Sequence, residues 1–163
     1  MKRGFILLIF GLFISIVASC DVKSSGISSP DENISVHFEL DKEGKFFYTI
    51  HHKKEAIIDT SFIGFEFTNA PTLNKGFIAR VKAPEEIEET WQMPWGEQLN
   101  VENNYKQVKV ELQEKFDLKR KLNIVFRVYN DGVGFRYEFP EQENLKEVCI
   151  KFLIKIHGHK KVF

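Results

Sequence analysis

Two tryptophans and a glutamate lie close together near the middle of the chain, within the run Trp-Gln-Met-Pro-Trp-Gly-Glu. They are Trp91, Trp95 and Glu97. Indole rings stack on the apolar C–H faces of sugars, and carboxylates accept hydrogen bonds from sugar hydroxyl groups. Pro94 and Gly96 flank Trp95 and favour a shaped loop, and loops often carry binding residues. These three residues are therefore candidates for contact with an oligosaccharide. The alternative is that both indoles fill a core or a domain interface and that Glu97 is a solvated loop residue.

The acidic residues form no recognisable catalytic pair. Glycoside hydrolysis needs two carboxyl groups about 5 Å apart for retention, or about 6.5–9.5 Å apart for inversion. Four glutamates within residues 85–89 form a charged run that we expect to be solvated, and Glu141 and Glu143 follow a proline in an expected loop. His51 and His52 would point to opposite faces of a strand. The sequence therefore predicts no catalytic residue, no metal site and no cofactor in this chain.

The strongest structural signal is a β-hairpin within residues 122–145. Apolar and polar residues alternate over residues 122–129 and again over residues 134–139, as in strands with one buried face. Asn130-Asp131-Gly132 lies between the two runs, and these residue types tolerate the positive φ angles of tight hairpin turns. Arg127 and Arg136 are expected to face outward and to pair with glutamates on neighbouring strands.

Similar runs cover most of the remaining chain, and no segment has the periodicity of a helix. The expected strands span residues 34–40, 45–52, 56–58, 62–68, 77–82, 106–113 and 147–154. Cys149 lies among apolar residues in the last of these strands and is expected to be a small buried side chain. Short strands separated by turn signals are typical of a sandwich or barrel. The predicted class is all-β, an antiparallel β-sandwich.

The N-terminus has the pattern of an export signal. Lys2 and Arg3 precede an apolar run over residues 5–17, which is shorter than the ~20 residues of a transmembrane span. Small residues before Cys20 resemble a bacterial lipobox. We therefore expect residues 1–19 to be removed and Cys20 to carry acyl chains that anchor the protein in the periplasm or at the outer membrane. An ordinary signal peptide with an incidental cysteine is the alternative.

The charge balance argues against a nucleic-acid partner. The chain has 23 basic and 23 acidic residues, and without residues 1–19 it has 21 and 23, a net charge of −2. Nucleic-acid binding needs a concentrated basic surface. The expected partners are an oligosaccharide and, through the lipid alone, a membrane. Residues 20–30 are expected to be the lipidated end and a flexible tether, followed by a folded domain over residues 31–150.

Four segments together resemble the N-terminal β-sandwich domain of glycoside hydrolase family 97, a family of bacterial α-glucosidases and α-galactosidases. They are SPDENISVHFELDKEGKFFYTI, GFEFTNAPTLNKGF, MPWGEQ followed by NNYKQ, and the hairpin LNIVFRVYNDGVGFRYEFPEQENL. They occur in the order found in that family, over residues 29–148. The resemblance implies a sandwich of the galactose-mutarotase-like supersandwich type, here incomplete.

The resemblance also implies where the chemistry of such an enzyme lies. In that family the catalytic carboxylates belong to a (β/α)₈ barrel that follows the sandwich, and calcium is held largely by glutamates beyond this segment. None of those residues is carried over, so the chain alone is expected to be inactive, and calcium is expected in the full-length family only.

The C-terminal residues have an unusual composition. Residues 151–163 contain no acidic side chain, and the resemblance fades near Cys149. We interpret them as an atypical tail from a frameshift or truncation before the barrel, with a short paralogue as the alternative. The expected function is that of a non-catalytic N-terminal domain of an exported α-glycosidase. The alternative is a stand-alone carbohydrate-binding or structural lipoprotein of the cell envelope.

Overall fold

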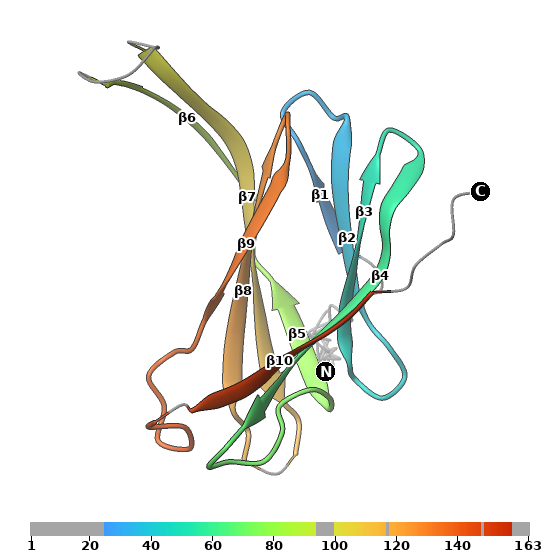
Figure 1. Ribbon diagram of the computed structural model, residues 1–163, viewed down its shortest axis with the longest axis vertical. Coiled ribbons are helices and arrows are strands. Elements are labelled where there is room, and N and C mark those ends of the chain that lie inside the picture. The colour runs from blue at the N-terminus through green and yellow to red at the C-terminus, as the bar shows by residue number, and fades with distance from the viewer. Residues whose placement is uncertain (1–24, 94–99, 117, 148, 158–163) are drawn as a thin grey trace, which may run out of the picture.

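Ten antiparallel strands form two sheets in the computed structural model, which describes residues 25–93, 100–116, 118–147 and 149–157 (Figure 1). Sheet A has the order β1-β2-β3-β4-β10, with strands Ser25–Ser28, Ile34–Leu40, Phe46–His52, Glu55–Phe67 and Ile150–His157. Sheet B has the order β5-β7-β8-β9, with strands Phe77–Val81, Asn100–Glu114, Lys121–Tyr129 and Val133–Glu138. Its fifth strand is β6 (Glu85–Gln92), which also pairs with β7. The described residues contain no helix long and apolar enough to cross a membrane. The predicted all-β sandwich is confirmed.

The core lies between the two sheets because apolar side chains alternate along the strands that face each other. Phe126 of sheet B is fully buried, and its ring centroid lies 5.6 Å from that of Phe38 and 5.7 Å from that of Tyr48, both in sheet A. Val108 and Val110 of β7 are also buried. Burial of a side chain of this size contributes about 1.5–3 kcal/mol to folding. These contacts hold the inner faces together, so the odd-numbered residues of β7 point outward.

The predicted hairpins are confirmed, but the geometry of one turn differs. Strands β2 and β3 pair as expected, and so do β8 and β9. The backbone amide of Tyr129 donates to the carbonyl of Gly132 at 2.8 Å, yet no residue between β8 and β9 has a positive φ. Left-handed conformations occur elsewhere, at Gly44 and Gly76 with φ of 71° and 74°, and at Glu32, Lys53 and Lys119. The prediction of positive φ between β8 and β9 was wrong.

Strand β4 is longer than the sequence suggested. Residues 56–58 and 62–68 were expected to be separate strands, because polar residues lie between them. The structure has one strand from Glu55 to Phe67, which pairs with β3 through register shifts near Ile50. Such bulges absorb extra residues without ending the strand. The strand therefore reaches the far end of the sandwich, where it pairs with β10.

The C-terminal part of the expected tether is structured. Ser25–Ser28 forms strand β1 on β2, and the side chain of Ile27 is buried. The Ser29 hydroxyl donates to Asp31 Oδ1 at 2.5 Å and accepts a hydrogen bond from the backbone amide of Ile34 at 3.0 Å. The prediction of a flexible tether was therefore wrong from Ser25 onward, because one apolar residue and a hydroxyl are enough to attach this segment. The lipidation candidate Cys20 lies outside the described residues.

The C-terminal residues up to His157 belong to sheet A. Strand β10 pairs with β4 from Ile150 to His157. Cys149 precedes this strand and is exposed, so the prediction that it is buried was wrong. The reason is that β10 is the last strand of the sheet, and side chains at a sheet edge lack a neighbour on one side. Phe152 and Leu153 are accordingly 59% and 46% exposed.

Candidate carbohydrate-contact surface

Strands β6 and β7 form an arm that extends beyond the rest of sheet B (Figure 1). Strand β6 pairs with β7 from Asn100 to Gln107, whereas β8 pairs with β7 only as far as Tyr105. Residues 88–92 and 100–104 therefore make a two-stranded ribbon that no third strand supports among the described residues. We call this ribbon the arm.

Trp91 lies on the arm and not in the core. It is opposite Val101 in the register, and its side chain is 44% exposed. The segment that was expected to be a loop is therefore a strand at Trp91. It forms because the backbone of β6 pairs with β7, although the side chains of β6 are mostly exposed. The alternative that Trp91 fills the sandwich core is excluded by its exposure. Trp95 and Glu97 lie outside the described residues.

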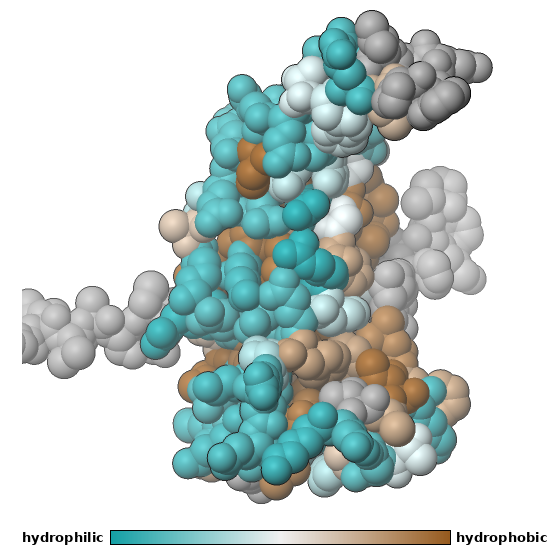
Figure 2. All heavy atoms as spheres, turned by 90° about the vertical axis from the view of Figure 1, so that its left-hand side faces the viewer, coloured by the Kyte–Doolittle hydropathy of each residue, from teal (hydrophilic) through white to brown (hydrophobic). Residues whose placement is uncertain are grey.

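The outer face of sheet B connects Trp91 with a row of polar and aromatic residues. Successive side chains of a strand point to opposite faces, so alternate register pairs share one face. From the arm inward, the face of Trp91 continues through the register pairs Glu89–Asn103, Ile87–Tyr105 and Glu85–Gln107. The Asn103 side-chain amide donates to Glu89 Oε2 at 3.2 Å. Figure 2 shows that this side of the molecule is largely hydrophilic, with small apolar areas between the polar side chains.

Two aromatic rings and a guanidinium meet at the base of the arm. The ring centroids of Tyr105 and Tyr129 are 5.0 Å apart, and the guanidinium of Arg127 lies 4.7 Å from the Tyr105 ring centroid. Arg127 Nε also donates to Gln107 Oε1 at 2.8 Å. The sequence predicted a glutamate as the partner of Arg127, and this was wrong. The guanidinium is therefore fixed in one orientation by a π face and an amide oxygen.

Glu138 joins two cations on the same outer face. Lys109 Nζ lies 2.8 Å from Glu138 Oε2, and Arg136 Nη2 lies 2.9 Å from Glu138 Oε1. The hydrogen bond from Lys109, followed by that from Arg136, lowers the pKa of the Glu138 carboxyl below its ordinary value. Arg136 thus pairs with a glutamate of its own strand, whereas the sequence suggested a cross-strand pair.

A second carboxyl group, that of Asp31, also has a lowered pKa, because it accepts hydrogen bonds from the Ser29 hydroxyl and from Asn33. A general acid needs a raised pKa, and both of these shifts are in the opposite direction. Across the described ranges, no group of three or more His, Cys, Asp or Glu residues could hold a metal ion. The surface offers a stacking ring and oriented hydrogen-bonding groups.

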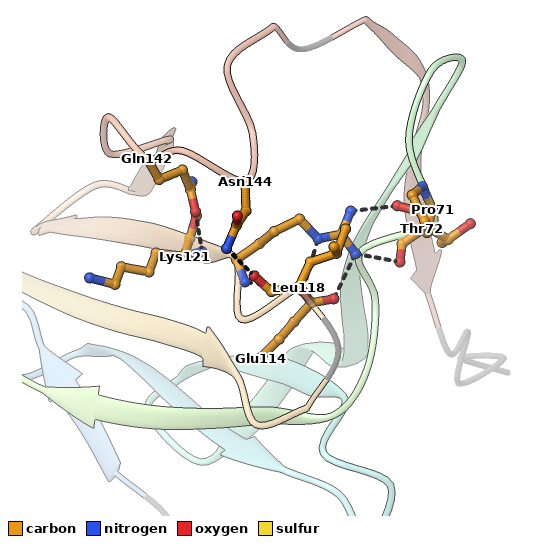
Figure 3. A network of polar contacts seen from close by, with 8 residues as sticks. Pro71, Thr72, Glu114, Leu118, Lys121, Gln142 and Asn144 are labelled. Atoms are coloured by element: carbon orange, nitrogen blue, oxygen red, sulfur yellow. Dashed lines mark hydrogen bonds and ion pairs between the residues drawn. The ribbon is translucent and has the colours of Figure 1, made fainter.

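A second polar cluster joins three loops at the other end of the sandwich and is structural (Figure 3). The Arg120 guanidinium donates to the carbonyl of Pro71 at 2.6 Å, and the side-chain amide of Asn144 donates to the carbonyl of Leu118 at 2.7 Å. The backbone amide of Lys121 donates to Gln142 Oε1, also at 2.7 Å. Because its polar groups are bonded to one another and to backbone carbonyls of the loops, this cluster fixes loops and leaves little for a ligand. Sequence reasoning found neither cluster, since both depend on register.

The chain matches a known protein family over most of its length. The family model described as "Glycosyl-hydrolase 97 N-terminal" matches residues 27–161. The chain therefore belongs to glycoside hydrolase family 97, through the N-terminal domain of that family, and the resemblance seen in the sequence is confirmed. The match continues beyond Cys149, where we expected it to fade.

Solved structures agree with the family assignment. A glycoside hydrolase family 97 enzyme from Pseudoalteromonas sp. strain K8 has been solved as a variant with panose and in complex with acarbose. Each is 29% identical to this chain with a TM-score of 0.75, over 80% of this chain and 20% of the enzyme. A β-arabinopyranosidase, 21% identical, shares the fold with a TM-score of 0.68, over 78% of this chain and 20% of its own. The chain thus spans about a fifth of these enzymes.

Proposed function

We propose that this chain acts as a non-catalytic N-terminal domain of an exported glycoside hydrolase that cleaves α-glycosidic bonds of oligosaccharides. In this role it packs against a catalytic barrel and contacts carbohydrate. The proposal is supported by the match to the N-terminal domain of the family and by the length of the related enzymes, four-fifths of which lies outside the matched region. Panose, bound by one relative, is an oligosaccharide of the proposed class.

The exposed indole of Trp91 is the observation that carries the proposed contact with carbohydrate. It lies on an arm whose side chains are otherwise mostly charged or polar, and it shares a face with oriented groups of sheet B. A sugar ring needs both features, because one of its faces is apolar and its edge carries hydroxyl groups. Trp95 and Glu97 remain proposed contacts from the sequence.

A fluorescence titration tests the contact. The chain has two tryptophans, Trp91 and Trp95, so its indole emission reports on this segment alone. Addition of panose should shift the emission, and Trp91→Ala should weaken binding at least about fivefold, because stacking of a ring on an aromatic side chain is worth about 1–3 kcal/mol. Phe116→Ala is the matched control, since Phe116 is also exposed but lies at the opposite end of β7. Unchanged affinity in Trp91→Ala would remove the stacking role.

Export and lipid anchoring are part of the same proposal and rest on the residues before Cys20. The chain should incorporate labelled palmitate when it is expressed in a bacterium, and Cys20→Ala should abolish this. Palmitate labelling that persists in Cys20→Ala would contradict the proposal that Cys20 carries the lipid. Calcium enters the proposal only as a cofactor of longer family members.

A stand-alone carbohydrate-binding or structural lipoprotein is the second candidate. It is favoured by the single apolar core that joins both sheets, from Ile27 in β1 to Val128 in β8. Thermal unfolding separates the candidates. A sharp cooperative transition of the isolated chain would favour the stand-alone function, whereas a broad transition with aggregation would favour dependence on a barrel.

A further inference from the structure

A notch opens on the outer face of sheet B where β5 gives way to β6. Both strands pair with β7 along the same edge, and Lys82, Ala83 and Pro84 lie between them. The backbone amide of Lys82 still donates to the carbonyl of Lys109 at 2.9 Å, whereas Pro84 has no amide hydrogen to donate. The interruption leaves a hollow of about 230 Å³.

The notch combines a small apolar base with polar side chains around it. Val125 of β8 lines it and is only 2% exposed, although it belongs to the outer face. Around Val125 stand Gln107 and Lys109 of β7 and Arg136 and Glu138 of β9. The volume lies below the about 300–1,000 Å³ of sites that hold drug-sized ligands. It suits one ring of a larger molecule.

The polar groups of the notch are already oriented. Glu138 is bonded to both Lys109 and Arg136, and Gln107 accepts a hydrogen bond from Arg127. Groups held in this way lose little side-chain entropy when they bind a ligand. Exposed ion pairs by themselves contribute little to stability, so stability alone is a weak reason for this arrangement.

Most of the charged groups in and beside the notch are paired. The cations are Lys82, Lys109, Arg127 and Arg136, and the anions are Glu85, Glu111 and Glu138. Lys82 Nζ lies 3.1 Å from Glu111 Oε1. Because the two signs nearly balance, an ionic ligand gains little long-range attraction. The notch therefore suits a neutral polyhydroxylated ring.

The notch and Trp91 lie on one face. Glu85 and Gln107 are register partners at the notch, and Trp91 is six residues further along β6. At about 3.3 Å per residue the separation is at most about 20 Å. An oligosaccharide of a few rings can span this distance along the Ile87–Tyr105 pair.

We infer that the notch between β5 and β6 is a second carbohydrate subsite, which binds one neutral sugar ring of an oligosaccharide whose other end contacts Trp91. The inference rests on the proposed carbohydrate contact and extends it from one side chain to a surface. Arg136 and Gln107 donate hydrogen bonds to vicinal hydroxyls, Glu138 accepts one, and the apolar base meets a C–H group of the ring.

Isothermal titration and ¹⁵N NMR of the full chain in detergent micelles test the inference with panose as the probe. Arg136→Gln should weaken panose binding about fivefold and abolish the amide shifts at Val125, while the shifts at Trp91 persist. Arg80→Gln is the matched control, because Arg80 is also an exposed arginine of sheet B but does not line the notch. Gln107→Ala provides a second test should Arg136→Gln lose its native spectrum.

The possible outcomes distinguish the two proposals. If panose shifted the amide NMR signal of Trp91 alone and the affinity of Arg136→Gln were unchanged, the notch would be rejected and the proposed function kept. An equal loss of affinity in Arg136→Gln and Arg80→Gln would also reject the notch, because it would indicate a general charge effect. No shift at any residue at millimolar panose would overturn both proposals.

Discussion

Arg120 and Glu114 are joined side chain to side chain by two hydrogen bonds inside the protein. Arg120 Nε lies 2.8 Å from Glu114 Oε2, and Arg120 Nη2 lies 2.6 Å from Glu114 Oε1. Their side chains are only 2% and 9% exposed. Two further guanidinium N–H groups donate to the carbonyls of Pro71 and Thr72 (Figure 3). The pair thus fixes the β7–β8 turn to the loop between β4 and β5.

Loss of Arg120 should destabilise the protein strongly. Arg120→Ala leaves the Glu114 carboxylate and two carbonyl groups without their partner in a buried place, and removal of one member of a buried pair costs about 3–5 kcal/mol. Arg120→Lys should restore only part of this, because an ammonium cannot make the two parallel bonds. Urea unfolding measures the change, with Arg80→Ala as the exposed control. A loss below 1 kcal/mol in Arg120→Ala would contradict the structural role.

Glycines 44 and 132 should respond differently to alanine. Gly44 has a φ of 71°, and a Cβ there would lie 2.9 Å from the backbone nitrogen of Phe77. Gly44→Ala should therefore lower stability by about 1–3 kcal/mol. A Cβ on Gly132 would meet no atom within 4 Å, and its φ is not left-handed, so Gly132→Ala should be neutral or slightly stabilising. Thermal unfolding of the two variants compares them directly, and equal losses would refute this distinction between the turns.

Alternation of side chains explains which strands could be predicted. In β2, β3, β8 and the inner half of β7, every second residue is apolar and buried. Each of these strands has one face on the core, so its pattern is visible without the structure. The sandwich and its two main hairpins follow from that pattern.

The strands that were missed have little side-chain burial of their own. Strand β1 has one apolar residue, Ile27, and therefore resembles a linker. Strand β6 was predicted only as a solvated charged run, and its glutamates are indeed exposed. It forms because its backbone pairs with β7. Backbone pairing leaves no periodic signal in the sequence, and this limits prediction at the arm.

The candidate surface was predictable only in part. Trp91 could be selected by residue type and by the nearby proline and glycine, but its place on a strand could not. The contact of Arg127 with Tyr105 and Gln107 requires the register of β7 against β8, which no local pattern specifies. The notch depends on two strands sharing one edge of β7, a feature of topology.

Glu138 should give the protein a specific dependence on pH. Its pKa is lowered from the ordinary 4.5 in the folded state, so the stability it contributes is present above about pH 4.5 and is lost as the pH falls toward the lower folded pKa. Because these ion pairs are partly exposed, the effect should be below about 1 kcal/mol. Glu138→Gln should lose less stability between about pH 5 and 3 than the unmodified chain. Urea unfolding at several pH values measures this, and Glu55→Gln serves as an exposed control. A steeper loss in Glu138→Gln would contradict the sign.

The free edge of β10 should make the chain associate with itself. One side of β10 pairs with β4, and no strand of the described residues pairs with the other side. Ile150, Phe152 and Leu153 on this strand are all exposed. A long apolar edge strand is a template for pairing with another chain. Sedimentation velocity should therefore show association that increases with protein concentration.

Phe152→Lys should reduce this association without disturbing the fold. Phe152 is opposite Glu66 in the register, and Glu66 already pairs with Lys151 at 3.2 Å. A lysine at position 152 therefore adds a positive charge to the exposed edge, and charged edge residues are a natural means of preventing pairing. Phe116→Lys is the matched control, because Phe116 is 66% exposed but lies in the turn after β7. If Phe116→Lys reduced association as much as Phe152→Lys, general surface hydrophobicity would be the cause. The edge of β10 would then have no special part in it.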